Sequence, residues 1–167
     1  MGLVHPLAHV ENATIGEGTS VWQFASVIRG AEVGKNCVIG SCSIVDGARL
    51  GDGCKIQHGA SVNPGVWCGS KVFIGPNATI CNDRWPSVDT EGFDLSQFKD
   101  MVTVFIHDGA SIGANAVVLP GMTIGQMAVV AAGAVVNRSV PDYHLFARDG
   151  KIVAIKPEWR RRRMWAA

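Results

Sequence analysis

Aliphatic residues recur at every sixth position over most of the chain. The spacing shortens once, between residues 39 and 44, and it is interrupted after residue 80. The aliphatic positions are Ile15, Val21, Val27, Val33, Ile39, Ile44, Leu50, Ile56, Val62, Ile74, Ile80, Ile106, Ile112, Val118, Ile124, Val130 and Val136, and Cys68 occupies one further position of the series. Because helices repeat about every 3.6 residues and strands every two, a period of six indicates a solenoid of short units.

Small residues stand four positions after most of these aliphatic residues, as at Ala25, Ala60 and Ala116. We expect each six-residue unit to form one face of a triangular coil, with the aliphatic side chain inside and neighbouring strands about 4.8 Å apart. Glycine often follows the aliphatic residue and is expected to adopt the corner dihedrals that a Cβ resists. The pattern therefore predicts an all-β fold, a left-handed parallel β-helix. A β-sandwich, the alternative, would show alternation with irregular turns.

The repeat stops over residues 81–105, where a long loop is predicted. Insertions in solenoids form loops on one face, and such loops often carry function. We expect residues 1–156 to form one β-helix domain, closed by an extended segment at Tyr143–Ile155. Residues 157–167 are predicted to form a short C-terminal helix that carries the run Arg160–Arg163.

Composition narrows the functional classes. The formal net charge of +1 argues against a general nucleic-acid surface, which requires a clustered basic face. No apolar stretch is long enough to span a bilayer, and the first residues lack the layout of a signal peptide, so we expect no membrane partner and a cytoplasmic protein. The five cysteines include no C-x-x-C pair, which favours a reducing compartment.

Several stretches carry a resemblance to a known family. They are VWQF at 21–24, KIQ at 55–57, SVNPGV at 61–66, FIGPNATICNDRWP at 73–86, GASIGANAVV at 109–118 and GAVVNRSVP at 133–141. With the hexads, these stretches resemble the hexapeptide-repeat acyltransferase superfamily over nearly the whole chain. The GPN…ND..P run resembles the bacterial N-acetyltransferases that act on nucleotide-linked amino sugars, in particular 3-amino sugars on dTDP or UDP for O-antigen and other surface-polysaccharide synthesis.

That resemblance implies acetyl-CoA as the donor and a homotrimer with three active sites at subunit interfaces. In such proteins the pantetheine arm lies along the edge of the late coils. Ala114 and Ala132 are one coil apart, and the peptide groups of both are the expected contacts of the arm. Corner packing is the alternative role for each alanine.

Cationic residues near the closing segment are expected to meet the CoA phosphates. Arg138, Arg148 and Lys151 are the candidates, and simple solvation is the alternative for each. The chain departs from the family here, because FARDGKIV stands where a G-x-P-A-[KR] element usually follows the final coils. This departure concerns the adenine end of the CoA site.

Acyl transfer to an amine requires a neutral amine, an aligned thioester and a donor to the oxyanion. The resemblance matches Asn82 to an asparagine that orients the amino group, and Asp83 to an acid that accepts an amine proton or binds a sugar hydroxyl. A turn at the end of a strand is the alternative role for both. Arg84 and Trp85 are expected to cover nucleotide phosphate and sugar, with a loop anchor as the alternative for Trp85.

The predicted loop contains no histidine, which favours an amine over an alcohol acceptor, since a deprotonated amine already has a free lone pair. His107 follows the loop, near the expected thioester end, and is the reserve general base. Gln57 and His58 lie on a coil before the loop and are candidate contacts of the acceptor sugar, with solvent exposure as the alternative for His58. The histidines lack the arrangement of a metal site, so no metal is expected.

The sequence therefore predicts an acetyl-CoA-dependent N-acetyltransferase acting on a nucleotide-linked amino sugar. Two alternatives stay open. A sugar O-acetyltransferase would require His107 or His58 as the base, whereas a non-catalytic trimeric scaffold would bind no acetyl-CoA.

Overall fold

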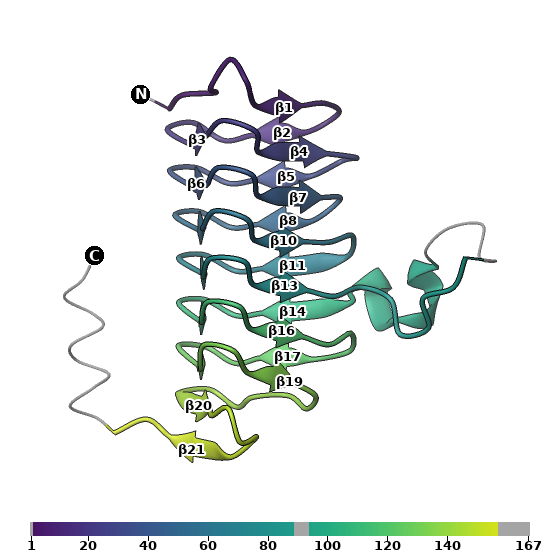
Figure 1. Ribbon diagram of the computed structural model, residues 1–167, viewed down its shortest axis with the longest axis vertical. Coiled ribbons are helices and arrows are strands. Elements are labelled where there is room, and N and C mark those ends of the chain that lie inside the picture. Colours follow the sequence, from purple (N-terminus) through teal and green to yellow (C-terminus); the bar gives the residue numbers. More distant parts are fainter. Residues whose placement is uncertain (1, 89–93, 157–167) are drawn as a thin grey trace.

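The structure, a computed structural model, describes residues 2–88 and 94–156. The chain winds into triangular coils that stack along one axis, with one strand from each coil in each of three sheets (Figure 1). This architecture confirms the prediction of an all-β, left-handed parallel β-helix. The predicted C-terminal helix and its run Arg160–Arg163 lie outside the described residues.

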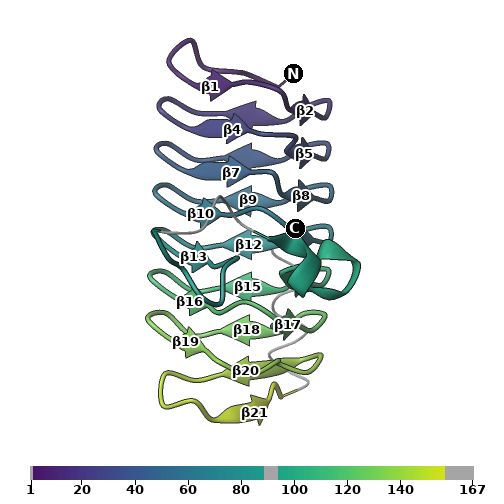
Figure 2. The same cartoon turned by 90° about the vertical axis from the view of Figure 1, so that its right-hand side faces the viewer.

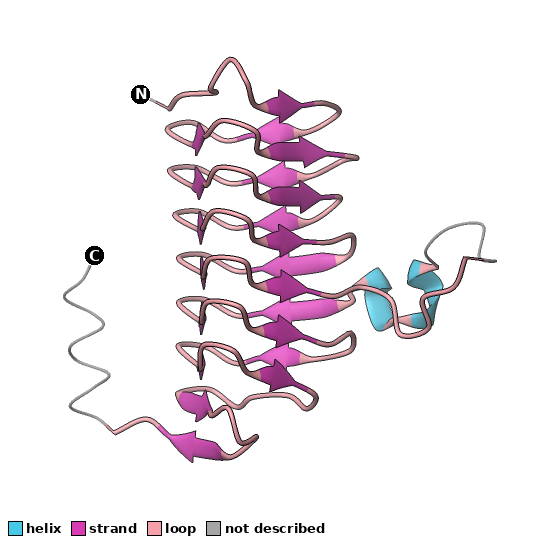
Figure 3. Cartoon of the chain, viewed as in Figure 1, coloured by secondary structure: helices cyan, strands magenta, loops and turns pink. Residues whose placement is uncertain are grey.

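The three sheets form three faces of stacked strands (Figure 3), here called B, C and A. Each coil visits them in that order. Face B contains β1 (His9–Val10), β4 (Ser26–Ile28), β7 (Ile44–Asp46), β10 (Ser61–Val62), β13 (Thr79–Ile80), β16 (Val117–Val118) and β19 (Val135–Val136). Face C contains β2 (Thr14–Ile15), β5 (Glu32–Val33), β8 (Arg49–Leu50), β11 (Val66–Cys68), β14 (Val104–Ile106) and β17 (Thr123–Ile124). Face A contains β3 (Ser20–Val21), β6 (Val38–Ile39), β9 (Lys55–Ile56), β12 (Phe73–Ile74), β15 (Ser111–Ile112), β18 (Val129–Val130), β20 (His144–Phe146) and β21 (Ile152–Ala154). The described strands pair in parallel, except that β21 runs antiparallel to β20 and closes the helix end.

The interior is filled by the aliphatic positions of the hexads. Ile39, Ile56 and Ile74 pair in register on face A, and each side chain is fully buried. Ala60 and Ala78, four residues after Ile56 and Ile74, are also buried at the corners. The tube is narrow, so close packing admits a branched side chain on each face and only a small one at each corner.

One inward position differs from the predicted hexad. The spacing predicts Ile44 as an inward residue, but Val45 is fully buried while Ile44 is 41% exposed. Val45 pairs with Val27 and Val62, so the shortened step falls between Val45 and Leu50. The prediction was wrong because two β-branched aliphatic residues stand side by side, and spacing alone does not choose between them.

The glycines that follow inward residues are needed because neighbouring coils approach closely at these positions, and not because the backbone is left-handed there. At Gly75 an added Cβ would lie 2.7 Å from the backbone nitrogen of Ala114, and at Gly113 it would lie 2.4 Å from that of Ala132. Neither glycine has a positive φ. The left-handed corner residue comes two positions later, as at Asn77 with φ 56°. The predicted reason for these glycines was therefore wrong, because contact between coils excludes their Cβ.

The predicted long loop is confirmed, since β13 ends before residues 81–103 and β14 begins after them. The loop leaves the corner between faces B and C and projects sideways from the coils (Figure 1, Figure 2). It carries two short 3-10 helices, η1 (Leu95–Gln97) and η2 (Lys99–Met101), and Phe98 between them is buried. No helix in the described part of the chain has the length and apolar character needed to cross a membrane.

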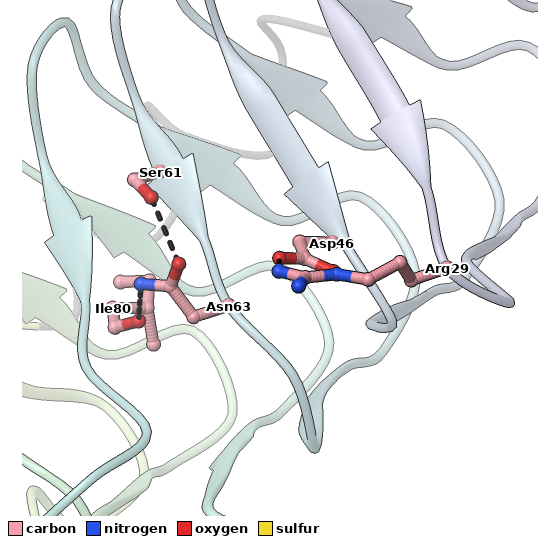
Figure 4. Close-up of polar contacts among 5 residues, drawn as sticks. All are labelled: Arg29, Asp46, Ser61, Asn63 and Ile80. Atoms are coloured by element: carbon pink, nitrogen blue, oxygen red, sulfur yellow. Dashed lines mark hydrogen bonds and ion pairs between the residues drawn. The ribbon is translucent and has the colours of Figure 1, made fainter. Parts of the chain in front are cut away.

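Polar side chains tie neighbouring coils at the B–C corner, just before the loop (Figure 4). Arg29 Nε donates to Oδ1 of the buried Asp46 at 2.6 Å, and a second guanidinium nitrogen pairs with the other carboxylate oxygen. In the next coil, Asn63 Nδ2 donates to the carbonyl oxygen of Ile80 at 2.8 Å, and Ser61 Oγ donates to Asn63 Oδ1 at 3.1 Å. Because Ile80 is the last strand residue before the loop, this bond fixes the edge from which the loop departs.

Candidate active site

A groove of about 490 Å³ lies between the loop and the outer surface of face C. Trp67, Phe105 and His107 contribute to it from the coils, and Arg84 and Phe98 contribute from the loop. The structure thus brings together two of the residues predicted from the sequence, His107 and Arg84. Arg84 lies near the start of the loop, whereas His107 follows β14, the first strand after the loop.

Among the described coils, His107 occupies a position that is glycine in five other coils and Pro141 in the last one. It directly follows the inward Ile106, at the corner between faces C and A. The equivalent residues are Gly16, Gly34, Gly51, Gly69, Gly125 and Pro141. The half-buried imidazole lies 4.4 Å from the ring of Phe105, centroid to centroid. Its place in the groove suits a general base, and that role stays a prediction. Within the described residues, no group of three or more potential metal ligands occurs.

Arg84 crosses the opposite side of the groove. Its guanidinium carbon lies 5.0 Å from the centre of the Phe98 ring, and a Cβ added at Gly121 would lie 2.5 Å from its Nη2. Among the described residues Arg84 forms no ion pair with a carboxylate. A guanidinium without a carboxylate partner presents several donors to an anion, which suits the predicted contact with a nucleotide phosphate.

The other predicted loop residues do not line the groove. Asn82 and Asp83 are half-buried at the root of the loop. Asp83 Oδ1 accepts a hydrogen bond from the backbone nitrogen of Trp85 at 2.9 Å, which is the turn contact considered as its alternative role. The side chain of Trp85 is largely exposed, and no structural contact tests its predicted role on the sugar. The functional roles of these three residues stay predictions.

Ala114 and Ala132 stack at a different edge, the corner between faces A and B. The carbonyl of Ala114 accepts the backbone N–H of Gly133 at 2.8 Å. Within the described chain, the N–H groups of both alanines donate no backbone hydrogen bond, and their contact with the pantetheine arm stays a prediction. Gln57 and His58 lie at the same corner in an earlier coil. The predicted donor contacts and these two predicted sugar contacts therefore share an edge that is separate from the groove.

Two of the predicted phosphate-binding cations are engaged within the closing segment. The guanidinium of Arg138 lies 5.9 Å from the ring centre of Phe146 and donates to the carbonyl of Gly150. Lys151 Nζ lies 2.8 Å from Asp149 Oδ2. This contact raises the pKa of the ammonium group of Lys151 and lowers the pKa of the carboxyl group of Asp149. These contacts account for both cations without a ligand, and their binding role stays a prediction.

Arg148 is the predicted cation that lies beside the alanine edge. Its side chain is exposed, and its Cδ is 3.9 Å from the position that a Cβ on Gly133 would take. Since Gly133 follows Ala132 directly, Arg148 stands at the C-terminal end of the edge formed by Ala114 and Ala132. The role of Arg148 on the CoA phosphates stays a prediction.

The aromatic floor of the groove was not predicted from the sequence. Trp67 and Phe105 pair across β11 and β14, with ring centroids 5.8 Å apart in an edge-to-face arrangement. The guanidinium of Arg49 lies 5.2 Å from the ring centre of Trp67. One available signal was that both aromatic residues occupy the outward position directly before an inward residue, in a chain with few aromatic residues.

Two hexapeptide-repeat families match the chain. Residues 12–47 match the family described as bacterial transferase hexapeptide (six repeats). Residues 104–138 match the hexapeptide repeat of succinyl-transferase. The two matches lie on either side of the loop, where the coils are regular.

Two curated relatives are acetyltransferases. A segment of 40 residues is 55% identical to dTDP-3-amino-3,6-dideoxy-alpha-D-galactopyranose 3-N-acetyltransferase of Aneurinibacillus thermoaerophilus and covers 24% of this chain and 21% of that protein. A segment of 77 residues is 32% identical to galactoside O-acetyltransferase of Lactococcus lactis subsp. lactis (strain IL1403), covering 46% of this chain and 36% of that protein. The matched segments thus span well under half of each relative.

A solved structure shares the fold over most of the chain. The acetyltransferase domain of PglB from Neisseria gonorrhoeae FA1090, in complex with acetyl coenzyme A, aligns with a TM-score of 0.59 at 22% identity, over 92% of this chain and 57% of that chain. At this identity the likeness concerns the fold. The protein is therefore a left-handed β-helix whose residues 12–47 and 104–138 match hexapeptide-repeat families, and it resembles the acetyltransferases that carry such repeats.

Proposed function

We propose that this protein is an acetyl-CoA-dependent N-acetyltransferase whose acceptor is the amino group of a nucleotide-linked sugar. The observation that carries the proposal is the groove on face C, which holds a histidine at one side and, at the other, an arginine that pairs with no carboxylate among the described residues. The relative from Aneurinibacillus, named as a 3-N-acetyltransferase of a dTDP-linked 3-amino sugar, supports a 3-amino acceptor. A role in O-antigen or other surface-glycan synthesis belongs to the same proposal.

In this proposal the donor lies along the alanine edge. Acetyl-CoA would lie with its pantetheine arm against the peptide groups of Ala114 and Ala132 and its phosphates near Arg148. The N–H groups at this edge suit the amide groups of pantetheine. The PglB domain, which shares the fold, was solved with acetyl coenzyme A, and this supports the choice of donor.

A homotrimer would unite the two halves of the site, because the groove and the alanine edge lie on different parts of one chain. Face B offers a flat surface for this contact, since most of its outward residues are small or aliphatic and uncharged. They are Ser26, Ile44, Ser61, Thr79, Val117 and Val135. Packing this face around a three-fold axis would bring the alanine edge of one copy towards the groove of the next.

The chemistry follows from that arrangement. The neutral amine attacks the thioester carbonyl carbon, a C–N bond forms, and the C–S bond breaks as the CoA thiolate leaves. His107 receives the proton that the amine loses and returns it to the departing sulfur. Asn82 and Asp83 lie at the root of the loop and do not line the groove, so their predicted role on the amine stays separate from this arrangement.

A second function, sugar O-acetylation, is favoured by one specific observation. A hydroxyl acceptor requires a base, and His107 stands in the groove in a position to be one. The Lactococcus relative is named as a galactoside O-acetyltransferase. The nature of the acceptor atom separates the two functions.

The test is incubation of the purified protein with acetyl-CoA and a panel of dTDP- and UDP-linked amino sugars, beside the same sugars with hydroxyls in place of the amines. Mass spectrometry reads the products. A gain of one acetyl group on an amine supports the proposal, and a gain on a hydroxyl supports O-transfer. Absence of saturable acetyl-CoA binding would overturn both and leave the scaffold alternative.

A further inference from the structure

The floor of the groove is an aromatic surface to which no function has so far been attached. Trp67 and Phe105 are opposite each other in adjacent coils, with their rings at an interplanar angle of 67°. The ring of His107 lies next in line, tilted by 56° to that of Phe105. Trp67 is 38% exposed, although a side chain of its size gains most when it is covered.

Neighbouring charges hold this surface in place. The guanidinium of Arg49 packs over the ring of Trp67, and Arg49 Nε lies 3.3 Å from Glu32 Oε1 in the preceding coil. Glu32, Arg49 and Trp67 occupy successive rungs of face C. Because Arg49 covers part of the indole and is itself paired, the orientation of Trp67 is set before any ligand arrives.

Arg84 and His107 lie at opposite ends of the groove, along the direction of the strands of face C. Arg84 lies over Gly121, just before β17, and His107 directly follows β14 in the adjacent coil. Phe105 stands between these two sides. A strand of three residues spans about 10 Å, which is comparable with the length of a hexopyranose that carries a phosphate.

We propose that Phe105, supported by Trp67, is the subsite for the sugar ring of the acceptor. The apolar C–H face of the pyranose lies over the aromatic floor, the phosphate on C1 points to Arg84, and the reactive amine points to His107. An amine on C3 or C4 lies across the ring from C1, whereas an amine on C2 is next to it. The groove therefore selects 3- or 4-amino sugars over 2-amino sugars. This inference rests on the proposed N-acetyltransferase function.

The first test changes the floor. Phe105→Ala is expected to raise the KM for the nucleotide-linked amino sugar about tenfold and to leave the KM for acetyl-CoA unchanged, and Phe105→Tyr should retain wild-type values. Phe73→Ala is the matched control, because Phe73 has the same outward position on face A. Calorimetry should show weaker binding of the nucleotide sugar to the Phe105→Ala protein, with equal binding of dTDP or UDP alone. An unchanged KM and affinity for the nucleotide sugar would overturn the assignment.

The second test varies the acceptor. UDP-linked 2-amino, 3-amino and 4-amino sugars are compared as substrates of the wild-type protein, and the 2-amino sugar is expected to be at least about tenfold poorer in kcat/KM. Equal or better use of the 2-amino sugar would overturn the inference and leave the proposed function intact. If no amine is acetylated although acetyl-CoA binds, the proposed function fails first.

Discussion

His107 is the residue whose replacement separates the two acyl-transfer functions. A free amine already carries its lone pair, so we expect His107→Ala to lower kcat for an amine acceptor by at most about tenfold. A hydroxyl acceptor should lose about 10²–10⁴-fold, the usual contribution of a general base. Steady-state kinetics with both acceptors measure this, and His5→Ala, next to the bridge between Val4 and Val21 at the opposite end of the helix from the groove, is the control. Equal losses with both acceptors would contradict the division of roles.

The buried thiol of Cys68 makes the free energy of unfolding depend on pH in the alkaline range. It takes an inward position of β11, and burial raises the pKa of its thiol to about 12, against about 8.5 in an unfolded chain. The folded state keeps the proton that the unfolded state loses, so this stabilisation is complete below pH 8.5 and is lost as the pH rises towards 12. Above pH 9 the free energy of unfolding should fall with pH more steeply in the wild type than in Cys68→Val, by up to about 1.4 kcal/mol per pH unit. Urea unfolding at several pH values measures both slopes, and parallel slopes would refute the assignment.

At the scale of the element, two kinds of glycine support the corners for different reasons. A Cβ at Gly113 would meet the backbone of the next coil, whereas Gly30 has φ 81° and nothing within 4 Å of an added Cβ. We expect Gly113→Ala to lower the free energy of unfolding by about 3 kcal/mol, since the backbone contact has no room to relax. Gly30→Asn should cost less than about 1 kcal/mol, because asparagine tolerates the left-handed region. Denaturant midpoints compare the two, and a larger loss at Gly30 would contradict this reading.

The strands and corners also show which parts of the fold could be predicted from the sequence. The period of six specifies faces and corners, and residues 18 apart stack, which is why Ala114 and Ala132 were predicted to share an edge and do so. This rule does not predict the contact between Trp67 and Phe105. The two residues are neighbours in space, but the loop between them makes their separation in the sequence 38 residues. The choice between Ile44 and Val45 was not predicted either, since both side chains suit a strand. The direction in which the loop folds, and hence the groove, is set by contacts such as that of Arg84 over Gly121, which spacing does not encode.

At the scale of the whole molecule, the β-helix is a scaffold in which one corner has been replaced by a loop. In the coil before the loop, Asn63, Pro64 and Gly65 join β10 to β11, and residues 81–103 join β13 to β14 in the same place. The pairing of Val66 with Val104 continues across the insertion, so the coils do not depend on the loop for their register. This separation of scaffold and loop makes the contribution of the loop measurable.

Replacement of residues 81–103 by the sequence Asn-Pro-Gly should therefore leave the fold intact and abolish acetyl transfer. The far-ultraviolet circular dichroism spectrum and the melting temperature should stay close to those of the wild type, because the strands on either side keep their partners. Saturable binding of acetyl-CoA should persist, since the alanine edge lies at another corner. Transfer to the amino sugar should be lost, because Arg84 and the outer wall of the groove are removed. If the shortened protein still acetylated the amine at the wild-type rate, the groove on face C would not be the acceptor site.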